Sequence, residues 1–367
     1  MDFDFSADQI QLRQDLRRFM QSAAPRTCTR AVLESDQGMD HHLWQQMVEM
    51  GITRLSLPET LGGFGMGIIE QCIAAAEQGR QLAPVPSIAS LYLAQQLLLQ
   101  LPACTARDAY IKASAEGKIF SVAIPTKSPW KSTILYNGGV LSGEHSLVLH
   151  GGDADHLLVY AHRPDGQAVI TVCNTSEVSL ESQPLIDASM SAANVSFQDT
   201  PCTLLAEGDA CEAILSSTLD RAACLLSFEQ MGACDAAFEM ANEYAKERHA
   251  FGRAIGSYQA IKHKLVDLFT QQQLSHAHCL YAAWALYTND SCLPTAAASA
   301  LLSSQEAFTA IASENIHIHG GMGYTWELDC HLFFKRARFY ASVLGNQHLW
   351  HARLGSELIT RLDSMEA

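Results

Sequence analysis

The chain has 367 residues, of which 48% are hydrophobic and 17% are charged, and its formal net charge is −15. This length predicts a globular protein of two or three structural units that share an extensive core. The negative charge argues against general nucleic-acid binding, because nothing neutralises phosphates in bulk. An anionic ligand would therefore bind through a few local Arg and Lys residues or helix N-termini.

The cysteines and the first residues indicate a cellular compartment. Eleven cysteines are scattered without a C-x-x-C pair, which is typical of buried free thiols in a reducing environment. The first five residues are acidic and lack the basic region and apolar core of a signal peptide. No apolar run reaches transmembrane length, so we expect a cytoplasmic protein with no membrane segment.

Residues 1–118 carry the pattern of an N-terminal helical domain. Leu12 and Leu16 recur at helical spacing. Asp40 is a candidate N-cap for the helix that follows it. The glycine-rich stretch 58–65 predicts a loop, because glycine adopts backbone angles that other residues resist.

The pattern changes to short β-prone runs over residues 119–205. These runs are 119–124, 147–149, 157–160, 169–172 and 194–197. Glycine pairs and a Pro-Asp-Gly turn interrupt them, which predicts a small antiparallel β domain. Residues 206–367 return to long apolar-periodic runs rich in Ala, Leu, Glu and Gln, and predict a C-terminal helical domain. The expected fold class is thus mixed and mainly α.

Two motifs in the C-terminal part carry a family resemblance. Arg248 begins an R-x-x-F-G pattern followed by I-G-x-x-Q, which ends at Gln259. About sixty residues later, His319 begins the pattern H-G-G-x-G-Y-T. Together they resemble the C-terminal four-helix bundle of the acyl-CoA dehydrogenase family, and the order helical, β, helical is that family's order. The resemblance covers most of the chain and implies FAD-dependent α,β-desaturation of a CoA thioester.

The resemblance also implies roles for individual residues. In the family, the C-terminal domain of one subunit holds the ADP half of a neighbour's FAD. Arg248 would contact the pyrophosphate, since a guanidinium presents a charged fork to phosphate oxygens. Phe251 would pack against the flavin side of the site, and Gln259 would hydrogen-bond the cofactor. Each has a plainer alternative: Arg248 as a solvated helix residue, and Phe251 as a core residue.

The second motif has its own cofactor contacts and its own alternatives. His317 stands where the family usually has Gln and would hydrogen-bond FAD, while Gly320 and Gly321 would let backbone approach it without a Cβ. The two glycines alternatively form a helix stop. His317 and His319 alternatively form a metal pair, but a spacing of two is poor on a helix and no carboxylate or Cys pattern supports it. We therefore expect no metal.

The catalytic base that the family requires is hard to place. Removal of the α proton needs a positioned carboxylate. The family's usual Glu position is Leu344 here, and the alternative position, on the helix before the R-x-x-F-G motif, is Ala222. Asp220 lies about 200° from Ala222 around that helix, and Glu229 lies on nearly the same face but roughly 10 Å along the axis. Asp220 and Glu229 are the candidate bases, and for Glu229 a buried structural role is the favoured alternative.

A second family feature is altered in the β domain. The family usually carries a Thr-Glu-x-x-Gly-Ser-like loop that hydrogen-bonds the flavin and the substrate. The corresponding stretch, 123–130, has two prolines, which remove backbone donors, and no acidic residue. Trp130 is an aromatic residue that would stack on a ring or belong to the core. This subunit is therefore expected to bind the flavin ring poorly in its own β domain.

The retained and missing features predict a division of labour between subunits. Short acyl-CoA dehydrogenases of α2β2 heteromers resemble this chain, including its Gly-Tyr-Thr-Trp-Glu-Leu-Asp stretch at 323–329, and several act on CoA thioesters of steroid side chains. The resemblance implies three partners: an acyl-CoA substrate, a second acyl-CoA dehydrogenase subunit and an electron-transfer flavoprotein. The alternatives are a homotetramer that uses Glu229 or Asp220 as base, a catalytically silent scaffold, and an unrelated helical binding protein.

Overall fold

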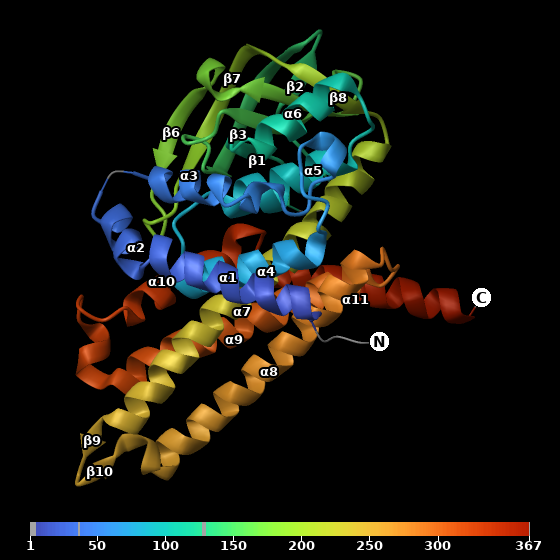
Figure 1. The fold of residues 1–367 in the computed structure, drawn as a ribbon. Coiled ribbons are helices and arrows are strands. Elements are labelled where there is room, and N and C mark those ends of the chain that lie inside the picture. Colours follow the sequence, from blue (N-terminus) through green and yellow to red (C-terminus); the bar gives the residue numbers. More distant parts are fainter. Residues whose placement is uncertain (1–4, 36, 127–129, 367) are drawn as a thin grey trace. The chain divides into compact units, whose positions relative to one another are not determined.

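The computed structural model describes residues 5–35, 37–126 and 130–366, apart from the side chains of 361–366. The chain divides into two compact units, each assembled from separate stretches of sequence (Figure 1). We call them the helical unit (Met1–Thr27, Ile68–Ala83 and Ala223–Ala367) and the mixed unit (Cys28–Gly67 and Pro84–Ala222). The domain boundaries that the sequence suggests, at residues 118 and 205, stay a prediction.

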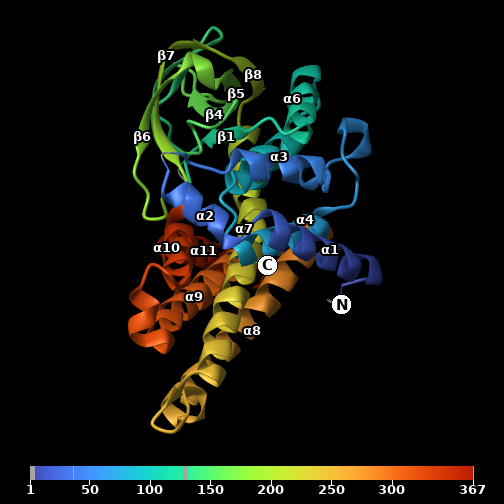
Figure 2. The ribbon, with the colours of Figure 1, turned by 60° about the vertical axis from the view of Figure 1, so that its left-hand side comes forward.

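The helical unit consists of long helices and one short hairpin. Its helices are α1 (Ala7–Ala23), α4 (Ile68–Gln81), the later part of α7 (Ala210–Glu247), α8 (Gln259–Tyr287), α9 (Leu293–His319), α10 (Cys330–Val343) and α11 (Gln347–Glu366). The hairpin strands are β9 (His249–Ala250) and β10 (Arg253–Ala254), and 3-10 turns cover Ile255–Ser257 and Gly320–Tyr324. Helices α7, α8 and α9 lie side by side, and the hairpin caps one end of them (Figures 1 and 2). The predicted helical C-terminal domain is confirmed.

Two glycines let α4 and α7 cross at close range. A Cβ on Gly79 would lie 1.8 Å from the carbonyl oxygen of Glu229, and a Cβ on Gly232 would lie 1.8 Å from the carbonyl oxygen of Ala76. Only glycine fits where two backbones approach this closely. The close approach fixes the position of Glu229, on α7, relative to α4.

Charged side chains join α1, α4, α7 and α8. Arg17 of α1 donates from Nη2 to Oε1 of Glu77 at 2.8 Å and from Nε to Oε2 at 2.9 Å. Arg80 lies 3.6 Å from Asp235, which is also 2.7 Å from Nε2 of His276. Glu77 is buried, and burying an ion pair costs desolvation, so these pairs fix helix register more than they add stability.

The mixed unit begins with short helices. They are α2 (Arg26–Leu33), whose first two residues belong to the helical unit, α3 (His41–Glu49), α5 (Gln95–Gln100) and α6 (Thr105–Ala115). Ile88–Ala94 is a π-helix, and 3-10 turns cover Ile52–Arg54 and Glu59–Leu61. The predicted N-cap is confirmed: Asp40 accepts a hydrogen bond from the backbone N–H of Leu43 at 3.0 Å. Gly62 has φ 89° in the predicted loop, which explains the glycine there.

The strands of the mixed unit form one sheet in the described part of the chain. They are β1 (Phe120–Ala123), β2 (Leu135–Asn137), β3 (Val140–Leu149), β4 (His156–His162), β5 (Ala168–Asn174), β6 (Ser179–Gln183), β7 (Ala192–Pro201) and β8 (Thr203–Glu207). Their order is β6-β7-β3-β2-β4-β5-β8, with β1 also pairing with β4. The pairs are antiparallel, as expected, except that β1 and β2 each pair with β4 in parallel.

Candidate functional site

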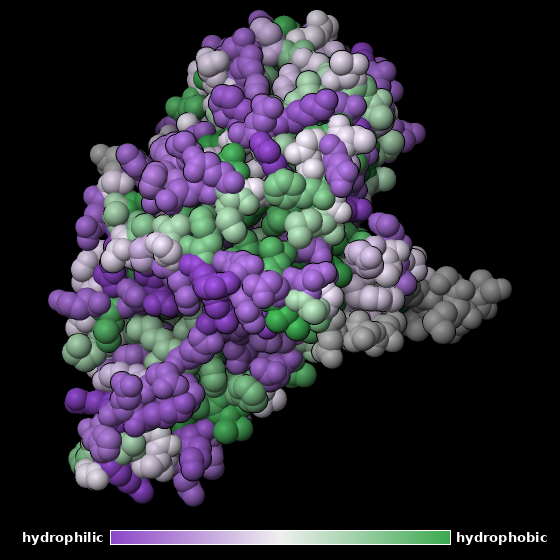
Figure 3. Space-filling view, viewed as in Figure 1, coloured by the Kyte–Doolittle hydropathy of each residue, from purple (hydrophilic) through white to green (hydrophobic). Residues whose placement is uncertain are grey.

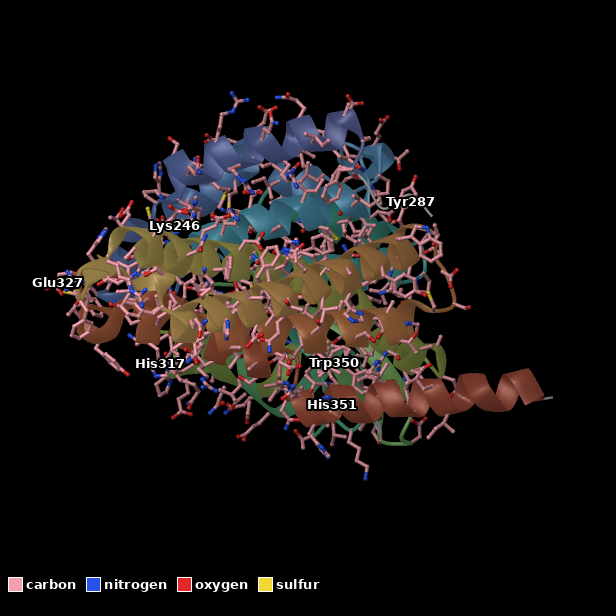
Figure 4. All side chains as sticks on the ribbon, turned by 90° about the horizontal axis from the view of Figure 1, so that it is seen from below. Lys246, Tyr287, His317, Glu327, Trp350 and His351 are labelled. Atoms are coloured by element: carbon pink, nitrogen blue, oxygen red, sulfur yellow. The ribbon has the colours of Figure 1, made fainter. Side chains whose placement is uncertain are left out.

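The residues of both C-terminal motifs lie at one end of the helical unit. Arg248 follows the last residue of α7, and His317 is in the last turn of α9. The view from below shows Lys246, His317 and Glu327 at one end of the helices and Tyr287 and Trp350 toward the other (Figure 4). Two motifs that are about sixty residues apart in sequence are therefore brought to the same end of the bundle.

A small hydrophobic cluster joins the two motifs. Ala245, Leu265 and Ile318 are buried together, and Ile255 packs against them. The rings of Tyr244 and His319 stack with their centroids 4.1 Å apart and an interplanar angle of 26°. Each motif thus contributes apolar side chains to one core, which fixes the hairpin relative to the end of α9.

The hairpin presents Arg248 to solvent on a braced backbone. The N–H of Arg248 donates to the carbonyl of Tyr244, and its own carbonyl accepts from Ile255, both at 2.8 Å. Tyr258 donates from its hydroxyl to the carbonyl of Ala250 at 2.9 Å. The guanidinium of Arg253 lies 4.0 Å from the centre of the Tyr258 ring. The backbone is therefore held, while the Arg248 side chain stays exposed.

Phe251 is the most unusual residue of the hairpin. Its side chain is 97% exposed, and its φ of 50° places it in the left-handed region, where residues with a Cβ are strained. Gly252, with φ 82°, completes the turn. A fully exposed aromatic ring on strained backbone is a feature of a binding surface rather than of a folded core.

The two histidines at the end of α9 point to different environments. Nδ1 of His317 lies 3.3 Å from Oε2 of Glu314, whose same oxygen lies 2.7 Å from Lys264, and the His317 side chain is 61% exposed. His319 is buried, and its Nδ1 lies 2.8 Å from the carbonyl oxygen of Asn315. Burial lowers the pKa of His319, against the opposing effect of that hydrogen bond. Neither histidine belongs to a cluster of metal-ligating side chains in the described part of the chain.

The glycines after α9 leave bare backbone at the same end. A Cβ built on Gly320 or Gly321 would meet no atom within 4 Å, and Gly320 has φ 60°. Gly252 in the hairpin is equally open. Exposed backbone, an exposed Arg and an exposed aromatic ring are the groups that a phosphate-bearing, ring-containing cofactor such as FAD requires. The residues present therefore fit the ADP half of FAD.

A pocket of about 590 Å³ lies beside the hairpin, between α7 and α8. Its lining includes Lys246, Lys262, Ser257 and Phe269. Lys262 and Phe269 are seven residues apart on α8, a spacing that puts them on one helix face. The sequence analysis did not identify Lys246 or Lys262 as candidate site residues. For Lys262, the i, i+4, i+7 spacing with Val266 and Phe269 was an available signal.

Glu229 lies in a buried hydrogen-bond network. The hydroxyl of Tyr340 donates to its carboxylate, and Nη1 of Arg336 donates to that hydroxyl at 3.3 Å. Arg336 is fully buried and also donates to the carbonyls of Leu82 at 3.1 Å and Ala83 at 3.4 Å. Burial, followed by the neighbouring carboxylate, raises the pKa of Tyr340 well above its ordinary value. The carboxylate of Glu229 is therefore an acceptor that already holds a phenolic hydroxyl.

The other positions considered for the base are also buried. Asp220, in the mixed-unit part of α7, is 3% exposed, and Ala222 is fully buried. Leu344 is buried after α10, and its carbonyl accepts a hydrogen bond from Nε1 of Trp350 at 2.9 Å. No described contact distinguishes Asp220 or Glu229 as a base, and both assignments stay predictions.

The altered loop of the β domain lies partly outside the described residues. Residues 127–129 of the 123–130 stretch are not described. Trp130 is buried, and its carbonyl accepts a hydrogen bond from the hydroxyl of Tyr160 at 3.4 Å. The side chain of Trp130 therefore belongs to the core of the mixed unit.

Comparison with known proteins places this architecture among related enzymes. The chain is 32% identical to acyl-CoA dehydrogenase IpdE2 of Mycobacterium tuberculosis, over 95% of this chain and 96% of the relative. It is 28% identical to acyl-CoA dehydrogenase FadE27 of the same organism, over 94% and 96%.

Solved structures show the same fold. A variant of the Tcur3481–Tcur3483 steroid acyl-CoA dehydrogenase matches with a TM-score of 0.86 and 26% identity over 97% of this chain and 99% of that one. The ChsE4–ChsE5 complex of Mycobacterium tuberculosis matches with a TM-score of 0.87 and 24% identity over 98% and 99%.

Two family profiles together cover most of the sequence. The profile described as "Acyl-CoA dehydrogenase, N-terminal domain" matches residues 6–118, and "Acyl-CoA dehydrogenase, C-terminal domain" matches residues 212–354. Both agree with the fold and with the motifs that lie together at the end of the bundle. The chain belongs to the acyl-CoA dehydrogenase family of oxidoreductases.

Proposed function

We propose that this chain is one subunit of an FAD-dependent acyl-CoA dehydrogenase that forms a double bond between the α and β carbons of a CoA thioester. It works in an α2β2 heteromer with a second, unlike acyl-CoA dehydrogenase subunit. The observation that carries this proposal is the exposed group at the end of the helical unit, where Phe251 is 97% exposed beside exposed Arg248. These side chains are arranged for a ligand or partner outside their own unit.

Each of these exposed residues has a role toward FAD. Arg248 binds the pyrophosphate through its charged fork. Phe251 packs against the flavin side of the site, and Gln259 and His317 donate or accept hydrogen bonds. The open backbone at Gly320 and Gly321 admits the cofactor without steric conflict. When bound at these residues, FAD would supply the acceptor for the hydride that leaves the β carbon of the substrate.

The base that removes the α proton belongs to the second subunit in this proposal. Ala222 and Leu344, the two positions where the family places a Glu, are apolar here. Glu229 already accepts a hydrogen bond from Tyr340, beside the buried Arg336. A base at Glu229 would have to give up that buried hydrogen bond before it took a proton, which favours a structural role for it.

An exposed apolar face of α8 supports a subunit interface. Val266 is 56% exposed, Phe269 is 49% exposed and Leu274 is 57% exposed. The space-filling view shows hydrophobic surface over the hairpin-side half of α8, between polar areas (Figure 3). Apolar side chains that gather on one surface mark an interaction site. The proposed occupant is the second acyl-CoA dehydrogenase subunit.

The substrate class and the electron acceptor follow from similarity. The chain is 26% identical to a protein described as a steroid acyl-CoA dehydrogenase. A CoA thioester of a steroid side chain, or of a similarly bulky acyl group, is therefore the proposed substrate. An electron-transfer flavoprotein is the proposed acceptor, by likeness to the family as a whole.

The test is the amount of FAD bound by the purified chain alone and after co-expression with a second acyl-CoA dehydrogenase that carries a Glu at the position of Ala222. The expected result is little FAD alone and about one FAD per pair of unlike chains, with turnover of a steroid-side-chain acyl-CoA by the pair only. One FAD per chain, with turnover by the chain alone, would favour the homotetramer with Glu229 or Asp220 as base. A pair that binds no FAD would favour the scaffold.

The first residue to change is Arg248. In the co-expressed complex, Arg248→Ala should weaken FAD binding about tenfold or more, because charge-assisted hydrogen bonds to phosphate are lost. The readout is the FAD dissociation constant from fluorescence titration. Lys112→Ala removes the same charge from an exposed site on α6 and is the matched control. Equal affinity for FAD in both variants would contradict the role of Arg248.

A further inference from the structure

A buried glutamine of the mixed unit lacks hydrogen-bond partners for its side chain. Gln96 on α5 is 1% exposed. Neither its amide nitrogen nor its amide oxygen has a partner among the described residues. A side-chain amide has two donor hydrogens and an acceptor oxygen, and buried groups of this kind are normally satisfied by protein, water or ligand. The hydrogen-bonding capacity of the Gln96 amide is therefore unused among the described residues.

The neighbouring glutamines of α5 behave differently. Gln95 is equally buried, and its Nε2 donates to the carbonyl of Thr53 at 3.0 Å and to Oγ of Ser114 at 3.2 Å. Gln100 donates from Nε2 to Oγ1 of Thr218 at 2.8 Å. The helix thus uses glutamine amides on both sides of Gln96 to bind its neighbours. Gln96 is the same residue type on the same helix, so its lack of hydrogen-bond partners comes from its local surroundings.

The position of Gln96 associates it with the acyl group. Gln96 and Gln100 are four residues apart, so they share one helix face, and Gln100 contacts α7 through Thr218. Ala222 lies one turn beyond Thr218 on α7, at the position where other members of the family carry a catalytic Glu. Gln96 thus shares a helix face with Gln100, whose contact on α7 is one turn from the predicted reaction position.

The backbone before Gln96 is irregular. The π-helix Ile88–Ala94 directly precedes α5, and all seven of its residues are buried. A π-helical turn re-aims the residues that follow it and is often found at functional sites. The irregular turn and the unpartnered amide adjoin each other in the chain.

We propose that Gln96 is a specificity-determining residue whose amide hydrogen-bonds a ketone or hydroxyl oxygen on the acyl part of the substrate. The inference rests on the proposed acyl-CoA dehydrogenase function and names the kind of acyl group that this site takes. The group is neutral, because a carboxylate in so buried a position would need a cation to offset its desolvation. A plain hydrocarbon acyl group leaves the amide unsatisfied and is the poorer substrate.

The experiment uses the co-expressed complex and two probes, cyclohexanecarboxyl-CoA and 4-oxocyclohexanecarboxyl-CoA. In Gln96→Met the preference in kcat/KM for the oxo probe falls about tenfold or more, as expected when a site loses its partner for a substrate oxygen. Turnover of the plain probe stays within about twofold. The same substitution raises the melting temperature of the ligand-free chain by about 2 °C or more, because it removes an unsatisfied buried amide.

Gln95→Met is the matched control. It removes an equally buried amide whose Nε2 has two partners, so it lowers the melting temperature and leaves the preference between the probes unchanged. The proposal is overturned by a lowered melting temperature for Gln96→Met, by an equal loss with both probes, or by no preference in the unaltered complex. If the complex turns over neither probe, and neither probe shifts the melting temperature of the complex, the proposed function is contradicted as well. Turnover of both without a Gln96 effect contradicts this inference alone.

Discussion

The residues that matter most at the candidate site combine exposure with a constrained backbone. Phe251 has φ 50° and an almost fully exposed ring. Strain of this kind persists only where the surrounding structure over-determines it, and here Tyr258 and Ile255 hold the hairpin. The hairpin is therefore prepared for binding before its ligand arrives, which reduces the entropy lost on binding.

A pH prediction follows from His319, on the other motif. Burial lowers its pKa, so the unfolded chain, with an ordinary value of 6.5, binds the proton more readily than the folded chain. Its contribution to stability is then complete above pH 6.5 and declines as the pH falls. The melting temperature of His319→Phe, which retains a ring to stack on Tyr244, should fall less between pH 7 and pH 5 than that of the unaltered chain.

The comparison is read from thermal unfolding at several pH values. His145 and His156 have lowered pKa values for the same reason, so the substitution removes only part of the pH dependence. His42→Gln, at an exposed position on α3, serves as control and should leave the dependence unchanged. An identical slope in His319→Phe and the unaltered chain would rule out this origin.

Among elements, the crossing of α4 and α7 sets a strict size limit. Gly232→Ala would place a Cβ 1.8 Å from the carbonyl oxygen of Ala76. Backbone cannot yield as a flexible side chain does, so the expected loss is at least about 3 kcal/mol of unfolding free energy. Denaturant unfolding measures it.

Gly355 on α11 is the control for this substitution. A Cβ there meets no atom within 4 Å, so Gly355→Ala should stabilise the helix by up to about 1 kcal/mol. If Gly232→Ala proved as harmless as Gly355→Ala, the close approach of α4 and α7 would be wrong.

The sequence predicted elements well where periodicity was strong. The runs at 157–160 and 169–172 lie within β4 and β5, both almost wholly buried. Strands β2, β6 and β8 were missed. β2 has three residues, β6 is exposed along nearly its whole length, and β8 has one buried residue, so none shows the apolar pattern of a buried strand. The parallel pairing of β1 with β4 depends on contacts distant in sequence, which local patterns do not encode.

The sequence indicated which residues belong to the candidate site, but not where their side chains lie or which partners they contact. The motifs indicated Arg248 and His317, and the structure brings them to one end of the helical unit. Spacing alone did not reveal that His319 turns into the core onto Tyr244 while His317 stays exposed. The network around Glu229 was also hidden, because Tyr340 is 111 residues away in sequence.

At the scale of the whole molecule, the apolar face of α8 predicts association. Val266→Glu places a charge on that face at a position that is 56% exposed, so folding should be little affected. The affinity between the two unlike subunits should fall at least about tenfold, because a charge would be buried at an apolar contact. Analytical ultracentrifugation of the co-expressed pair gives the measurement.

A comparable change elsewhere tests the specificity of that result. Leu180→Glu alters a side chain that is 40% exposed on β6 of the mixed unit. It should leave the assembly intact. Equal dissociation by both variants would show that added charge, rather than the α8 face, disrupts the complex.

No helix in the described part of the chain is both long and apolar enough to cross a bilayer. Within the helical unit, apolar side chains of different helices pack against one another, as the Tyr244–His319 stack and the cluster at Ile318 illustrate. The molecule is thus built around internal helix contacts that draw on distant parts of the sequence.

The helical unit also imposes an order on biosynthesis. Helices α1 and α4 leave the ribosome early, yet α4 ends at Gln81 and its partner stretch of α7 begins at residue 223, so the two lie 142 positions apart. At about 5–20 residues per second, α4 waits about 7 to 28 s for that partner. During this interval the apolar side of α4 is accessible to chaperones. A nascent chain truncated before residue 223 lacks the part of α7 on which α4 packs.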